Sequence, residues 1–138
     1  MSAALEGLYA APIRAHARNP RHRGRLECAD ASAKGDNPLC GDRVEVFLAM
    51  QDGRIAQASF IGRGCDVSQA SADLLAEAVQ GLDAAEARAL SAQVRAMART
   101  GERGEALGAV GALAAAARFR RRVKCATLPW VTLEAALD

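Results

Sequence analysis

Alternating apolar and polar residues in the middle of the chain predict an antiparallel hairpin. The segment "RVEVFLAM", residues 43–50, has the period of two that is typical of a half-buried strand. Its apolar side chains share one face: Val44, Val46, Leu48 and Met50. The expected partner strand is "IAQASFIG", residues 55–62, and Asp52-Gly53 between the two is a strong signal for a tight turn. A third strand is expected from Leu26 to about Ala31.

Helical spacing precedes this hairpin. The apolar residues Leu5, Leu8, Tyr9 and Ile13 form a stripe that predicts a first helix. We expect Pro12 to interrupt this helix and "NPRHRG", residues 19–24, to end it.

Two further helices are predicted directly after the hairpin. Asp66 and Gln69 have the spacing of a capping box, and apolar residues continue at helical spacing to Gly81. Asp83 and Glu86 repeat this start signal, which predicts a second helix up to about Met97.

The C-terminal third is predicted to be helical as well. A loop is expected at residues 99–104, then an alanine-rich helix towards Phe119. A closing helix is expected after Cys125, with Pro129 near its first turn. This order of elements predicts an α+β fold, in which a small antiparallel sheet of about three strands packs against several α-helices, in one domain covering residues 1–138.

Composition and charge narrow the classes of function. A chain of 138 residues can bury a core without disulfides. The formal net charge of +2 gives little reason to expect a nucleic-acid partner, and no apolar run is long enough to span a membrane. The N-terminus has no secretory apolar region, so we expect a cytoplasmic protein whose four cysteines stay reduced. Reduced cysteines favour metal or sulfur chemistry over crosslinks.

Three cysteines stand in chemically marked surroundings. Cys40 lies in the expected surface turn "NPLCGDR", next to Gly41-Asp42, and Cys65 follows "GRG" at a predicted helix start. Cys125 lies between a basic run and "ATLPW". The intervals of 65 − 40 = 25 and 125 − 65 = 60 residues do not match a zinc ribbon. On these residues alone, a metal site and ordinary burial of small apolar thiols both remain open, whereas for Cys28 we expect burial.

The motifs around these cysteines resemble a known family. "NPLCGDRV", "GRGCDVSQAS" and "RVKCATLPW" are similar to the three cysteine motifs of the IscU, SufU and NifU N-terminal family of iron-sulfur cluster assembly proteins. "LYAAPIRAHARNPRHRG" resembles the first helix of that family and the loop after it. The resemblance extends over essentially the whole chain.

The resemblance implies that four residues converge into one metal or cluster site: Cys40, Asp42, Cys65 and Cys125. Thiolates and a carboxylate suit tetrahedral zinc, and thiolates also suit iron-sulfur clusters. Members of the IscU branch carry a histidine directly before the third cysteine, but here that residue is Lys124. The "RxKC" pattern and the long interval before Cys125 are closer to the SufU branch, which implies a zinc-dependent sulfurtransferase acting with a SufS-like cysteine desulfurase.

On this interpretation Cys40 is the sulfur acceptor, and Arg122 and Lys124 support the persulfide or the docking of the desulfurase. The alternative is an IscU-type scaffold that assembles a [2Fe-2S] cluster and passes it to downstream assembly or apo-proteins. A structural zinc protein is a third hypothesis. The basic run of residues 117–124 fits a solvated face equally well, and His16 is expected to be structural rather than a ligand.

Overall fold

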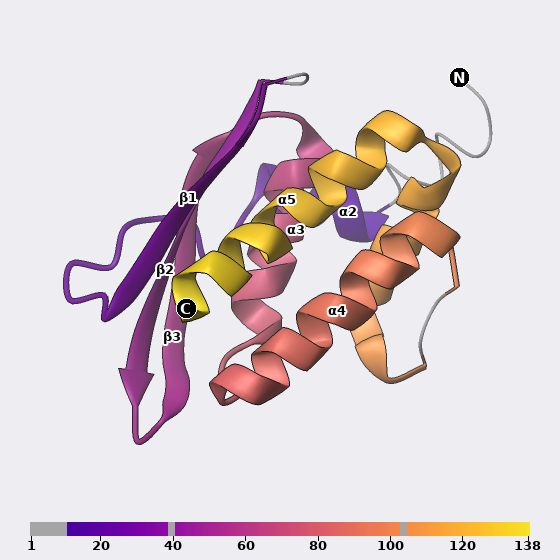
Figure 1. Cartoon of the computed structure of the whole chain (residues 1–138). Coiled ribbons are helices and arrows are strands. Elements are labelled where there is room, and N and C mark those ends of the chain that lie inside the picture. Colours follow the sequence, from indigo (N-terminus) through magenta and orange to yellow (C-terminus); the bar gives the residue numbers. More distant parts are fainter. Residues whose placement is uncertain (1–10, 39–40, 103–104) are drawn as a thin grey trace.

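A three-stranded antiparallel sheet forms one layer of the molecule and helices form the other (Figure 1). The structure is a computed structural model that describes residues 11–38, 41–102 and 105–138. Its elements are α2 (Ala11–Arg18), β1 (Ala31–Asn37), β2 (Asp42–Gln51), β3 (Arg54–Arg63), α3 (Asp66–Ala78), α4 (Ala84–Thr100), the 3-10 helical segment η1 (Glu105–Arg118) and α5 (Arg120–Leu137). Helices α3 and α5 contact the sheet, and α2, α4 and η1 pack on those two helices. The predicted α+β fold is confirmed.

The predicted hairpin is present as β2 and β3. Asp52 and Gly53 connect the strands with positive φ angles of 55° and 77°, as a tight hairpin turn requires. Val44, Val46 and Leu48 are buried on the helix-facing side of β2, in agreement with their spacing. On β3, residues 22–24 run alongside Phe60 as a short parallel bridge, because the Gly24 N–H donates to the Phe60 carbonyl at 2.7 Å.

The third strand lies later in the chain than predicted. β1 is the polar segment "ASAKGDN" and not Leu26 to Ala31. Its inward residues are small because α5 packs closely on it: a Cβ on Gly35 would lie 2.1 Å from the Thr132 hydroxyl oxygen. A strand whose inward residues are two alanines, a glycine and Asn37 has no strong apolar alternation for a sequence pattern to detect.

The start of α4 is as predicted, whereas the start of α3 differs. Asp83 and Glu86 form the reciprocal capping box of α4, and Gly101 ends that helix in a left-handed conformation. In α3 the N-cap residue is Cys65, so Asp66 is the first helical residue and the predicted Asp66 and Gln69 capping box is wrong. Helix α3 ends at Ala78, three residues before the predicted Gly81.

The C-terminal helices also differ from the prediction. The alanine-rich segment forms the 3-10 helical segment η1 with a kink at Gly108, not a regular α-helix. Helix α5 already begins at Arg120, so Cys125 lies inside the helix and not at an element boundary, and Pro129 lies in its interior. Trp130 is fully buried, and its indole N–H donates to the Ser71 hydroxyl at 3.0 Å, which joins α5 to α3.

Helix α2 carries the start of the chain onto α3. Ile13 is buried and Pro12 falls within the helical range, while the stripe residues Leu5, Leu8 and Tyr9 lie outside the described residues. In the described part of the chain, no helix is long and apolar enough to cross a membrane.

Candidate metal centre

Three candidate ligands meet at one end of the sheet. Asp42, Cys65 and Cys125 each offer one ligand atom, and these atoms lie within 4.8 Å of one another. Among the described residues this is the only group of three or more histidine, cysteine and acidic side chains so arranged. Asp42 opens β2, Cys65 caps α3 and Cys125 lies in the second turn of α5, so three separate elements build the site.

The Asp42 carboxylate is completely buried, with 0% of its surface exposed. Its Oδ1 accepts a hydrogen bond from the Cys65 backbone N–H at 3.0 Å, and its Oδ2 lies 4.0 Å from the Cys65 sulfur. This approach depends on Gly64, whose φ is +153° and whose added Cβ would lie 2.2 Å from Asp42 Oδ1. A buried carboxylate is unfavourable unless its oxygens are satisfied, so this one is suited to a cation.

Cys65 is the thiol that ionises first. The neighbouring Cys125 thiol, as a hydrogen donor, lowers the pKa of Cys65 to about 6, and the Ser68 backbone N–H and the Arg122 charge add to the effect. Burial and the Asp42 charge act in the opposite direction on this pKa. The place of this sulfur at the N-terminus of α3, where the backbone N–H groups lack helical partners, also favours a thiolate.

Cys125 is fully buried, and its sulfur lies 3.4 Å from the Arg121 carbonyl oxygen. Its hydrogen bond to Cys65, its burial and the Asp42 charge all raise the pKa of Cys125. Without a metal the pair therefore holds one proton on Cys125 and a thiolate at Cys65. A metal ion would replace that proton, since thiolates and not thiols are the ligands.

The donor set fits a soft or borderline metal. Two sulfurs and one carboxylate oxygen suit tetrahedral zinc, and such a site has room for a fourth ligand. We expect Cys40 to be that ligand, and it lies outside the described residues. Calcium and magnesium do not fit, because they bind all-oxygen sites.

The remaining predicted residues lie around this centre. Arg122 acts on Cys65 through its charge, whereas Lys124 is exposed and lines a neighbouring groove. The His16 Nδ1 atom lies 2.6 Å from the Asp73 carboxylate, so the expected structural role of His16 agrees with its contact. Cys28 is exposed, and the prediction that it is buried is wrong, because the segment predicted to be a strand there is a loop.

Two residues of the site have no ligand chemistry of their own and were missed by sequence reasoning. Gly64 permits the contact between Asp42 and the start of α3, and Ser68 supplies the N–H that favours the Cys65 thiolate. The available signal was the stretch "GCDVS", in which serine stands three residues after a helix-capping position.

Comparison with known proteins agrees with this arrangement. The NifU-like N terminal domain model matches residues 8–126. The chain is 35% identical to the zinc-dependent sulfurtransferase SufU of Bacillus subtilis, over 96% of this chain and 91% of that protein. It is 34% identical to the iron-sulfur cluster assembly scaffold protein IscU of Streptococcus pyogenes, over 96% of this chain and 84% of that protein.

A solved structure has the same fold. The crystal structure of a protein from Fervidobacterium islandicum AW-1, described as an iron-sulfur cluster assembly scaffold for the SUF system, superposes with a TM-score of 0.89 at 30% identity. The superposition covers 96% of this chain and 98% of that one. The family match over most of the chain, the two relatives and the shared fold lead to one conclusion: this chain belongs to the NifU-like N-terminal domain family.

Proposed function

We propose that this protein is a zinc-dependent sulfurtransferase of iron-sulfur cluster assembly, which accepts persulfide sulfur from a SufS-like cysteine desulfurase. The convergence of Asp42, Cys65 and Cys125 within 4.8 Å carries this proposal. It is supported by the name of the SufU relative and by the absence of a histidine before Cys125. The buried apolar residues form one cluster, which supports a single domain over residues 1–138.

In this proposal the zinc ligands are Cys40, Asp42, Cys65 and Cys125. Zinc supplies Lewis acidity that keeps the thiolates deprotonated at neutral pH. Cys65 and Cys125 would hold the metal from helices α3 and α5, and Asp42 would add an anionic oxygen ligand from the start of β2. Cys40 neighbours Gly41, whose φ is +73°, in the segment between β1 and β2.

The sulfur step is an exchange of one sulfur–sulfur bond for another. The Cys40 thiolate attacks the terminal sulfur of the desulfurase persulfide, so a new sulfur–sulfur bond forms at Cys40 and the old one breaks. The desulfurase cysteine leaves as a thiolate, and no external oxidant or reductant is consumed. We expect Arg122, whose charge favours the thiolate at Cys65, to help stabilise the anionic persulfide.

A scaffold function is the second candidate, because the Streptococcus pyogenes relative is named a scaffold protein IscU. The same four residues would then hold a [2Fe-2S] cluster before it is passed to apo-proteins. Cysteine thiolates are the usual ligands of such clusters.

Metal analysis and desulfurase kinetics separate the two functions. We expect about one zinc per chain after purification and strong stimulation of the desulfurase encoded in the same genome. Cys40→Ala should abolish the transfer of labelled sulfur to this protein, which intact-mass spectrometry measures. A chain that gives no stimulation, but that assembles and transfers a cluster, would establish the scaffold function instead.

A further inference from the structure

A groove lined by cations runs beside the metal centre, between the end of α4 and the start of α5. We call it the basic groove; its charged residues are Arg99, Arg120, Arg121 and Lys124, and its volume is about 740 Å³. The other described lining residues are Asn37, Ala117 and Val123. All four cations are exposed, so they are available to a ligand that enters the groove.

The charge of the basic groove has a single sign. Among the described residues, no acidic side chain lines it and none of its four cations forms an ion pair. Arg120 and Arg121 lie in the first turn of α5, where the helix dipole is positive and already disfavours cations. This arrangement is unfavourable in the isolated chain and becomes favourable when an anion binds.

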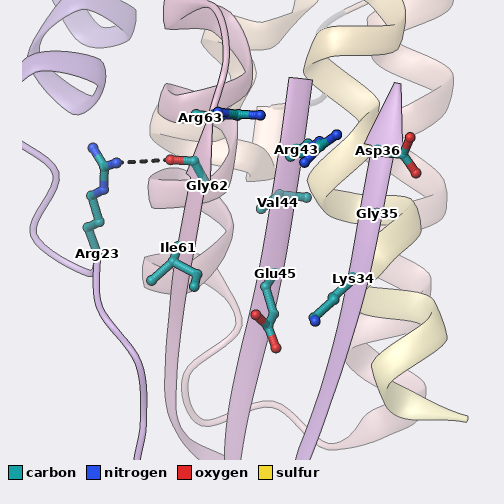
Figure 2. Close-up of a pocket in the computed structure, with 10 residues that line it drawn as sticks. All are labelled: Arg23, Lys34, Gly35, Asp36, Arg43, Val44, Glu45, Ile61, Gly62 and Arg63. Carbon is teal, nitrogen blue, oxygen red and sulfur yellow. Dashed lines mark hydrogen bonds between the residues drawn. The ribbon is translucent and has the colours of Figure 1, made fainter. Parts of the chain in front are cut away.

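A second pocket of similar size also carries several cations, but its lining includes carboxylates as well. Figure 2 shows this outer-face pocket, of about 720 Å³, on the side of the sheet that faces away from the helices. It carries Arg23, Lys34, Arg43 and Arg63, but Asp36 lies opposite Arg43 and Glu45 lies opposite Lys34 in the strand register. Two of its four cations, Lys34 and Arg43, therefore have a carboxylate opposite them on the neighbouring strand, whereas the described lining of the basic groove contains no carboxylate.

The basic groove also adjoins the metal centre directly. Lys124 precedes Cys125 in α5, and Asn37 lies opposite Asp42 in the register of β1 and β2. A protein segment bound in the groove would therefore place the rest of that protein next to the metal-binding side chains.

The groove suits an acidic protein segment better than a nucleotide or nucleic acid. None of its described lining residues is aromatic, so these residues offer no platform on which a base could stack. Its cations are carried on long, exposed side chains of α4 and α5, which suit several carboxylates on one protein segment. Resting on the proposed function, we propose that the basic groove docks an acidic surface segment of the protein that exchanges sulfur with the metal centre.

Charge reversal tests this proposal on the intact protein. The variant Arg120→Glu/Arg121→Glu places carboxylates where the dipole of α5 favours them, so it should fold at least as stably as the wild type. We expect its binding to the desulfurase of the same genome to weaken by about tenfold or more at low ionic strength, with a weaker salt dependence. The variant Arg120→Gln/Arg121→Gln should weaken binding less than the reversal does.

The matched control is Lys34→Glu/Arg43→Glu in the outer-face pocket, which makes the same change in net charge. Binding is measured by biolayer interferometry over a series of salt concentrations, with zinc content and thermal unfolding recorded for every variant. We expect the control to change affinity less than about threefold, since it alters no side chain of the basic groove and acts there only through the long-range field. The proposal is overturned if the groove reversal and the outer-face reversal weaken binding equally, or if neither weakens it. The proposed function would still stand in that case if the wild type stimulates the desulfurase.

Two other outcomes are decisive as well. If the wild type neither binds nor stimulates the desulfurase, the proposed function fails and this inference fails with it. If binding to single-stranded DNA depends on the basic groove and binding to the desulfurase does not, the groove is a nucleic-acid site and the proposal is wrong.

Discussion

Two aspartates of this protein, Asp42 and Asp73, are both completely buried, and they differ in what surrounds them. Asp73 in α3 has a partner for each oxygen: its Oδ2 lies 2.6 Å from His16 Nδ1, and its Oδ1 accepts the His22 backbone N–H at 2.9 Å. The partners of Asp42 belong instead to two cysteines: its Oδ1 accepts the Cys65 backbone N–H at 3.0 Å, its Oδ2 lies 4.0 Å from the Cys65 sulfur, and its carboxylate also accepts from the Cys125 thiol.

The difference separates a structural carboxylate from a candidate ligand. Asp73 is satisfied by protein groups alone, and its partners tie α2 and the following loop to α3. Apart from one N–H, the partners of Asp42 are two thiols, which are weak hydrogen donors and whose protons a metal ion would replace. Burial alone does not identify a functional carboxylate in this fold; the kind of its partners does.

Removing the Asp42 charge should produce the largest effect on metal binding. Asp42→Asn keeps an oxygen for the Cys65 N–H but loses the anionic ligand, so zinc affinity should fall by more than about 100-fold, beyond the loss typical of outer-shell changes. Competition with a chromogenic chelator measures this loss. The free energy of unfolding of the metal-free protein should stay within about 1 kcal/mol of the wild type, because the hydrogen bond survives.

Removing Asp73 should have the converse effect. Asp73→Ala leaves the His22 N–H buried without its acceptor and His16 without its carboxylate, so unfolding in urea should require about 2–4 kcal/mol less free energy. Zinc stoichiometry of the folded protein should be unchanged. His16→Ala keeps the bond from the His22 N–H and should therefore be the milder variant; a loss of zinc in either one would contradict the distinction between the two aspartates.

Alanine substitutions at two glycines, Gly64 and Gly53, test how much the close approach to Asp42 matters. Gly64→Ala puts a Cβ 2.2 Å from Asp42 Oδ1 at a positive φ, and it should reduce stability by about 1–3 kcal/mol and weaken zinc binding. Gly53→Ala also has a positive φ, of +77°, but nothing within 4 Å of the added atom, so it should cost only about 1 kcal/mol and leave zinc binding intact. Denaturation with and without a chelator compares the two, and equal zinc loss would show that the contact with Asp42 is irrelevant.

The smallest expected effect concerns the protonation of Cys65. In metal-free protein, its alkylation by iodoacetamide should rise with a midpoint near pH 6, well below the value of 9.0 for an ordinary thiol. Because the pKa is lower in the folded state, ionisation of Cys65 stabilises the fold at high pH, and this contribution is lost as the pH falls through about 6. Peptide mapping assigns the label to Cys65. In Cys125→Ala the midpoint should move up, since the main hydrogen donor is gone; an unchanged midpoint would assign the shift to the helix terminus instead.

Sequence patterns predicted those elements whose signals are local. The hairpin of β2 and β3 follows from apolar alternation around Asp52-Gly53, and the start of α4 follows from the Asp83 and Glu86 capping box. β1 was misplaced because its inward face is alanine and glycine under α5. The early start of α5 was missed because the basic run at 117–124 is typical of a loop or a solvated face, although packing on the sheet continues the helix through it.

The residues that make a metal site chemically possible are determined by the sequence alone: thiols and an adjacent carboxylate in three short motifs, with Cys65 at a helix start. Only the tertiary structure decided which side chains meet. In the fold, Asp42 lies beside Cys65 and Cys125, whereas Asp73 contacts His16. The cations of the basic run line a groove together with Arg99. The reason is physical: residue type fixes what an atom can bind, whereas distances between residues far apart in the chain depend on how helices and strands pack.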